Sequence, residues 1–190
     1  YNFADAVMQN VKLQGDVYYN EVTNKIVAYP SGQQFRWTML NLGMVKILGV
    51  EASAEGNACV SGVDLGLRLN YTYQSARDYT DKADSYYGHQ IPYIPLHSGS
   101  VVGRAGYRGW NFNYSFIYTG ERYNAQENIP INYEQPWYTH DASLTKDFLI
   151  KKVNCRVGVE VNNIFDQDYE VIVNYPMPGR NFKLTLKVNI

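Results

Sequence analysis

Apolar and polar residues alternate along several stretches of the chain, and no long apolar run interrupts them. In residues 110–119 one face carries Trp110, Phe112, Tyr114, Phe116 and Tyr118, and the other carries Asn111, Asn113, Ser115, Ile117 and Thr119. Strict alternation predicts β-strands, because successive side chains of a strand point to opposite faces. Apolar runs end after about four or five residues, whereas a membrane-spanning helix needs about 20. The chain is therefore predicted to be all-β.

Eight stretches have this alternation, and no segment has a helical period. The expected strands are 10–29, 37–56, 62–77, 97–107, 110–119, 137–148, 153–162 and 181–190. The first two are long enough to continue beyond a bilayer.

The connections between these strands alternate in length. Short turns are expected near 5–9, 57–62, 108–109 and 149–152, and long loops at 30–36, 78–96, 120–136 and 163–180. Consecutive antiparallel strands would place all short turns at one end and all long loops at the other. Outer-membrane barrels have this asymmetry, with short periplasmic turns and long extracellular loops. The C-terminus would then lie at the short-turn end.

Composition supports a membrane barrel and disfavours several other classes. Charged residues make up 18% of the 190 residues, below the roughly 25% of soluble domains. Tyrosine occurs 18 times. Lys and Arg number 17 against 18 Asp and Glu, so no concentrated positive surface suggests a nucleic-acid partner. Cys59 and Cys155 are interpreted as small apolar residues, because no metal-binding or disulfide spacing surrounds them.

Aromatic residues gather toward the strand ends, as in the interfacial belts of membrane proteins. The expected belt contains Tyr71, Tyr73, Tyr107, Trp110, Tyr118, Trp137 and Tyr138. In a soluble β-sandwich the apolar faces would pack against a second sheet. In a membrane barrel they would face lipid while the polar faces line water. The belt and the loop asymmetry together favour the barrel.

Several motifs resemble those of TonB-dependent outer-membrane receptors. Residues 41–51, NLGMVKILGVE, resemble that family's "N-x-G-x-x-x-x-x-G-V-E" strand, and residues 69–78, LNYTYQSARD, resemble its next strand. Residues 91–97, IPYIPLH, are similar to the "IPxxPxH" that begins the following strand. Residues 161–170, VNNIFDQDYE, followed by 176–182, PMPGRNF, are similar to the closing "N-hydrophobic-F-D-x-x-Y … P-G-R" signature.

The resemblance implies a 22-stranded barrel with an N-terminal plug, in the outer membrane of a Gram-negative bacterium of Bacteroidetes type. Residues 1–190 would supply the last eight strands, without the plug or the TonB-contact segment. The start Tyr1-Asn2-Phe3 lacks an initiator Met, as expected of a fragment or of a chain whose leader was removed. Such barrels usually end in an aromatic residue, and Ile190 departs from that pattern.

The resemblance also implies a function. The complete protein would take up a scarce nutrient, such as a ferric siderophore, haem, cobalamin or an oligosaccharide, by TonB-coupled transport. Its partners would be outer-membrane lipid, the remaining barrel strands, the plug and TonB, and no cofactor is expected. The barrel would perform no chemistry. His140, Asp141 and Ser143 could not form a triad, because neighbouring side chains of one strand point to opposite faces.

Ligand contacts are expected in the long loops, where aromatic rings and arginines can stack on a ligand or hydrogen-bond to it. The candidates are Tyr86, Tyr87, His89, Arg122, Tyr123, Tyr169 and Tyr175. Packing of each loop on its neighbours is the alternative role of these aromatics. Arg180 is expected to be structural, because Gly179-Arg180 opens the last strand.

Two further loop features have simple alternatives. Asp78, Asp81 and Asp84 could bind Ca²⁺ through oxygen ligands, but lack an EF-hand pattern, so solvated loop charge is the simpler interpretation and no metal site is predicted. His89 and His97 could ligate haem, but two loop histidines eight residues apart are more commonly ordinary loop residues.

Two other functions remain open. One is a complete eight-stranded outer-membrane barrel, an adhesin or structural protein, because eight is a permitted strand number. The other is a soluble β-sandwich that binds carbohydrate.

Overall fold

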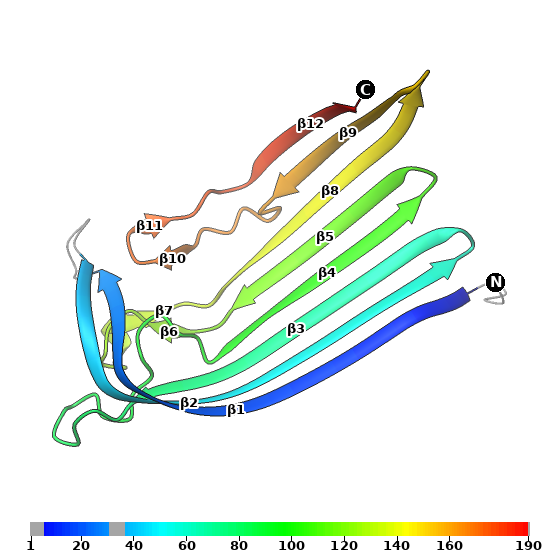
Figure 1. Ribbon diagram of the computed structural model, residues 1–190. Coiled ribbons are helices and arrows are strands. Elements are labelled where there is room, and N and C mark those ends of the chain that lie inside the picture. The colour runs from blue at the N-terminus through cyan, green and yellow to red at the C-terminus, as the bar shows by residue number, and fades with distance from the viewer. Residues whose placement is uncertain (1–5, 31–36, 190) are drawn as a thin grey trace.

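The computed structural model describes residues 6–30 and 37–189, which form one long, curved antiparallel sheet (Figure 1). Its eight strands pair in the order β1-β2-β3-β4-β5-β8-β9-β12. They are β1 (Ala6–Pro30), β2 (Trp37–Val60), β3 (Val63–Asp78), β4 (His97–Tyr107), β5 (Trp110–Thr119), β8 (Trp137–Ile150), β9 (Val153–Asn162) and β12 (Asn181–Asn189). In the described ranges, no helix is both long and apolar enough to span a membrane.

The strands match the expected ones to within a few residues. Both ends of β1 and the end of β2 extend beyond the alternating stretches, to 25 and 24 residues. At about 3.3 Å per residue, β1 is roughly 80 Å long, well beyond the hydrocarbon core. The turn expected at 5–9 was wrong for residues 6–9, which pair with β2 through an irregularity between Met8 and Asn10. Residues 31–36 and Ile190 lie outside the described part.

The short turns are tight because their residues adopt positive φ. Ser61-Gly62 connects β2 to β3, and Arg108-Gly109 connects β4 to β5. Such φ values favour Gly and Asn and are tolerated here by Ser61 and Arg108. Asn189 of β12 pairs with Asn154 at the start of β9, so the described C-terminal end lies at the short-turn end, as predicted.

One face of the sheet is apolar and open to the surroundings. Cross-strand register aligns rows such as Leu69, Val101 and Phe116. Exposed apolar side chains on this face include Leu13, Val17, Leu65, Leu67, Phe112, Leu144, Val159, Leu184 and Leu186. A continuous apolar surface of this extent needs an apolar environment, and a lipid bilayer provides one.

Aromatic rows border this apolar face. Tyr71, Gly99, Tyr118 and Tyr138 form one row near the long loops. Near the short turns, Tyr107 pairs with Trp110, and Lys146 Nζ lies 5.1 Å from the centroid of the Trp110 ring. Trp137 was wrongly placed in this belt, because it neighbours Tyr138 and therefore points to the opposite, polar side.

Ion pairs and hydrogen bonds connect neighbouring strands across the polar face. Arg68 pairs with Glu55 at 2.9 Å, and Arg104 Nη2 donates to Asn57 Oδ1 at 2.7 Å. Further along the sheet, Lys183 lies 3.8 Å from Glu160. Such polar lining is expected where the interior of a barrel is wet.

The buried core lies at the long-loop end. It contains Leu42, Val45, Ile47, Ala76 and Ile91, and Val45 is completely buried. By alternation, Val45 and Ile47 share a face with the polar residues Glu51 and Ser53. Ile91 comes from the connection between β3 and β4, so this loop folds over the polar face and packs against it.

Small hairpins give the other two described long loops regular structure. The loop after β5 contains β6 (Arg122–Tyr123), a 3-10 turn (η1, Pro130–Asn132) and β7 (Tyr133–Glu134). The loop after β9 contains β10 (Glu170–Ile172) and β11 (Tyr175–Pro176). Alternation did not predict these pairs, because two- or three-residue strands are too short to show a period.

The sheet remains open at β1 and β12. In the part of the chain that the structure describes, each of these strands pairs along one side only. Figure 1 shows the two edges on opposite margins of the curved sheet. Unpaired backbone groups cannot face hydrocarbon without a large loss of free energy, so these two edges bear directly on what the sheet can pair with.

Arginine substitutions on the two faces should differ in effect. Val101→Arg on the apolar face, near mid-strand, should cost about 2–4 kcal/mol of folding free energy in membranes. Ile117→Arg is the matched control, because Ile117 is 42% exposed, one register row away, and on the polar face. Heat-modifiable gel mobility of the complete protein in outer membranes measures folding. Equal loss in both variants would contradict the assignment of faces.

Candidate functional site

Three long loops are joined to one another by buried polar contacts at the long-loop end of the sheet. Gln90, in the β3–β4 loop, is buried. Its side-chain oxygen accepts from Ala76 N at 2.9 Å, and its Nε2 donates to Gln74 O at 3.0 Å. The side chain therefore satisfies backbone groups of β3 that a neighbouring strand would otherwise pair with, which anchors the loop against the sheet.

Asn128 joins this loop to the β5–β8 loop. Its Oδ1 accepts from Gln90 N at 2.7 Å, and its Nδ2 donates to Gln90 O at 3.0 Å. The backbone N of Asn128 donates to His89 Nδ1 at 3.2 Å. Residues 89 and 90 are thus held in one position relative to residue 128.

Arg122 joins the β5–β8 loop to the β9–β12 loop. Its side chain is 4% exposed. Its guanidinium donates to Gln135 O at 3.3 Å, Glu170 O at 2.6 Å and Val171 O at 3.3 Å. Burial lowers the pKa of Arg122, and the nearby Glu134 partly offsets that shift. An arginine so placed stays protonated at neutral pH, so a buried positive charge holds β10 against β6.

The closing signature forms a compact clasp between the end of β9 and the start of β12. Asn163 is 4% exposed and adopts a φ of 51°. Its Oδ1 accepts from Gln167 N at 2.8 Å, and its Nδ2 donates to Gln167 O at 2.8 Å. Asn163 N donates to Asp141 Oδ1 at 2.8 Å, which fixes the turn to the polar face of β8.

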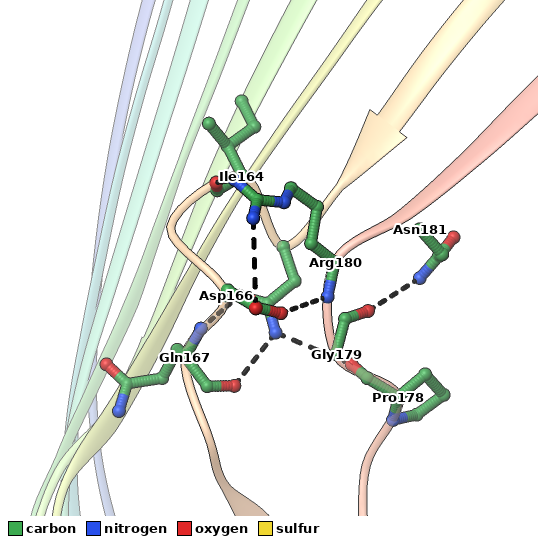
Figure 2. A network of polar contacts seen from close by, with 8 residues as sticks. Ile164, Asp166, Gln167, Pro178, Gly179, Arg180 and Asn181 are labelled. Carbon is green, nitrogen blue, oxygen red and sulfur yellow. Dashed lines mark hydrogen bonds and ion pairs between the residues drawn. The ribbon is translucent and has the colours of Figure 1, made fainter.

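Asp166 and Arg180 close the same clasp (Figure 2). Asp166 Oδ1 accepts from Arg180 N at 2.6 Å, and the two charged groups lie 3.8 Å apart. A Cβ at Gly179 would come within 2.9 Å of Asp166 Oδ1, so glycine permits this close approach. The structural role expected for Arg180 is confirmed.

The predicted contact residues divide into separate groups. Tyr87 packs edge-on against Tyr79 with ring centroids 5.1 Å apart, and Tyr123 packs against Tyr133 at 6.0 Å. Hydrogen bonding to Asp84 raises the pKa of Tyr86. These rings contribute to contacts within their own loops, the packing role that was left open.

The remaining tyrosines lie nearer the polar side. Tyr169 packs on Trp137 with ring centroids 4.6 Å apart, and Tyr175 lies 6.3 Å from Trp37. Burial raises the pKa of Tyr169, and Asp141 adds to the shift. Tyr169 is therefore placed over the polar face, together with Trp137.

The aspartates of the β3–β4 loop differ in their environments. Asp78 is 4% exposed, so the expectation of solvated charge was wrong for this residue. Its Oδ1 accepts from Thr80 N, and Asp81 Oδ1 accepts from Ala83 N. Within residues 6–30 and 37–189, no three His, Cys, Asp or Glu side chains gather closely enough to hold a metal ion.

The two histidines considered for haem have different surroundings. His89 contacts Asn128, as described above, whereas His97 Nδ1 lies 2.8 Å from Tyr71 Oη on the apolar side. His140 lies among Tyr114, Phe116, Tyr138 and Phe165, while Asp141 hydrogen-bonds Asn163 and Ser115 on the other face. These residues do not converge on one site, in agreement with the alternation argument.

Comparisons with known proteins agree with this architecture. The family described as "TonB dependent receptor-like, beta-barrel" matches residues 2–164. The chain is similar to the ferric-catecholate import receptor Fiu of E. coli K12, with a TM-score of 0.66, 19% identity and 93% of this chain covered. It is also similar to the FrpB iron transporter of Neisseria meningitidis, with a TM-score of 0.58, 14% identity and 95% covered. The chain spans 25% and 30% of the lengths of these two proteins.

The fold is thus that of a segment of an outer-membrane β-barrel. Because the family match covers most of the sequence, the chain belongs to the TonB-dependent receptor β-barrel family. This family comprises outer-membrane receptors and transporters of Gram-negative bacteria rather than enzymes.

Replacing Arg122 should loosen the contact between two loops. Arg122→Met would leave buried carbonyl oxygens without hydrogen-bond donors, which should cost about 1–3 kcal/mol of folding free energy. Amide hydrogen exchange at residues 170–172 of the complete protein should become about tenfold faster or more. Arg122→Lys should show much of this effect, because a lysine lacks the planar fork that reaches three carbonyls. Lys82→Met, in an exposed loop position, is the control, and unchanged exchange in Arg122→Met would contradict the assigned role.

The clasp should depend more on Asn163 than on the charge of Asp166. Asn163→Ala removes the side-chain hydrogen bonds to Gln167 and Pro178 and puts alanine at positive φ, so the free energy of unfolding should fall by about 2 kcal/mol or more. Asp166→Asn keeps the acceptor for Arg180 N and should change stability by about 0.5 kcal/mol or less, because the ion pair is exposed. Urea titrations of the complete protein, read by gel mobility, compare the two. A larger effect of Asp166→Asn would refute this ranking.

Proposed function

We propose that this chain is the C-terminal part of a TonB-dependent receptor that imports a scarce nutrient across the outer membrane. Residues 1–190 would supply eight strands of a larger barrel of about 22 strands. The remaining strands and the plug would come from the rest of the protein. Its ligand-binding surface would include the loops joined through Gln90, Asn128 and Arg122.

The observation that carries this proposal is the open two-faced sheet. Its apolar face can contact lipid, and its polar face can line a water-filled lumen. Its edge strands β1 and β12 each have one side on which a further strand could pair. The family match is consistent with each of these features.

The same observation disfavours the alternatives. A complete eight-stranded barrel would pair its first and last strands, whereas in the described residues β1 and β12 lie at opposite edges. A β-sandwich would bury the apolar face against a second sheet, whereas residues such as Leu184 and Leu186 are more than 70% exposed.

The joined loops suit a receptor because they present a pre-ordered surface. Ordering a flexible loop on binding opposes association. Here Gln90, Arg122 and Asn163 have already fixed the loops by buried hydrogen bonds. The candidate contacts Tyr86, Tyr87, His89, Tyr123, Tyr169 and Tyr175 would be displayed from these fixed loops, with Arg122 acting by positioning them.

The proposal is tested by growth and uptake in the source bacterium. A strain lacking the complete protein is compared with wild type on a panel of nutrients that are too large to pass through porins, including iron chelates, haem, cobalamin and oligosaccharides. The expected result is loss of uptake of one nutrient class, with the same loss when TonB is deleted. Normal uptake of every class in the mutant, or uptake that persists without TonB, would contradict the proposal.

A further inference from the structure

A groove of about 670 Å³ lies between two of the joined loops. This volume is within the range of about 300–1,000 Å³ that is typical of small-molecule sites. The residues of its lining that matter here are Tyr133, Glu134, Trp137, Asp168, Tyr169 and Glu170. They come from β7, the start of β8 and the segment that leads into β10, so the groove depends on the contact that Arg122 maintains.

One wall of the groove is aromatic. The rings of Trp137 and Tyr169 lie 4.6 Å apart with an interplanar angle of 31°. Trp137 is on the polar side of β8, as its neighbour Tyr138 belongs to the outer belt. The indole Nε1–H of Trp137 is buried and has no acceptor within the described residues.

The charged residues of the lining are all acidic, and Gln135 and Gln167 add neutral amides. Glu134, Asp168 and Glu170 contribute carboxylates, and the described lining contains no Lys or Arg. Glu134 already accepts from Asn124 Nδ2 at 2.6 Å, and Glu170 accepts from Asn174 N at 2.7 Å. Each carboxylate retains further lone pairs, so these groups can accept hydrogen bonds from ligand hydroxyls.

The charge of the groove disfavours an anionic ligand. Arg122, which hydrogen-bonds to the backbone of two lining residues, is buried and directs its donors to those carbonyls. An anion would therefore meet three carboxylates and no available guanidinium. Like charges held close together in a partly desolvated groove repel each other strongly.

We propose that this groove binds an uncharged, hydroxyl-rich ligand, specifically a short neutral oligosaccharide. A sugar ring would stack against the Trp137–Tyr169 wall, and its hydroxyls would donate to Asp168 and Glu170. The inference deepens the proposed function and rests on it, because it names the substrate class for the same loops.

The test is a glycan array that carries both neutral and acidic oligosaccharides, probed with the complete purified receptor in detergent. The expected result is binding to neutral glycans and not to acidic ones of similar length. Trp137→Ala and Tyr169→Ala should each weaken that binding by about tenfold, as expected for loss of an aromatic contact of about 1.4 kcal/mol. Tyr138→Ala is the matched control, because Tyr138 is the neighbouring aromatic residue on the opposite face, and it should bind as wild type does.

Charge selectivity is tested by neutralising the carboxylates. Asp168→Asn combined with Glu170→Gln should allow acidic glycans to bind, while neutral glycans bind several-fold more weakly. The inference is overturned if the unmodified receptor binds acidic glycans preferentially, if it binds no neutral glycan, or if the Trp137 and Tyr169 variants bind as wild type does.

The outcomes also separate the inference from the proposed function. TonB-dependent uptake of a nutrient that none of the groove variants alters would refute the groove assignment and leave the transport function intact. Neutral-glycan binding that requires Trp137, in a protein whose deletion affects no TonB-dependent uptake, would support the groove and refute the transport function.

Discussion

The backbone of a membrane-spanning segment must satisfy its hydrogen bonds within the protein, because hydrocarbon offers no partners. In this chain seven antiparallel pairings meet that requirement across eight strands. The alternation of apolar and polar residues follows from the same geometry, since every strand has one face toward lipid and one toward water. Within the described residues, β1 and β12 each pair along one side only, and we propose that further strands of a larger sheet pair with the other sides.

The backbone groups buried where the long loops meet the sheet also need hydrogen-bond partners. There, side chains rather than neighbouring strands hydrogen-bond to the backbone groups. Gln90 bonds to the backbone of β3, Arg122 to that of β10, and Asn163 to that of Gln167 in the clasp. Each of these residues is buried and connects segments that are distant in sequence. The result is a continuous layer of joined loops, and the acidic, aromatic-walled groove lies where two of them meet.

The strands could be predicted from the sequence because alternation is a local signal that repeats over ten or more residues. The contacts among loops could not be predicted in the same way. The predicted list included Arg122 for its charge, but its three carbonyl partners lie 13 to 49 residues away, and no local pattern encodes that distance. Gln90 and Asn128 gave no signal, since isolated amides occur in many loops. Trp137 was misassigned because its position at a strand end suggested the aromatic belt. Its place in the alternation, next to the outward-facing Tyr138, puts it on the polar face.

The account is tested most directly by the accessibility of single cysteines along residues 110–119 of the complete protein in native outer membranes. Cys59 and Cys155 would first be replaced by alanine. Labelling with a water-soluble maleimide should follow a period of two, with strong labelling at 111, 113, 115 and 117 and weak labelling at 112, 114 and 116. Uniform labelling of both faces would contradict a strand that separates lipid from a wet lumen.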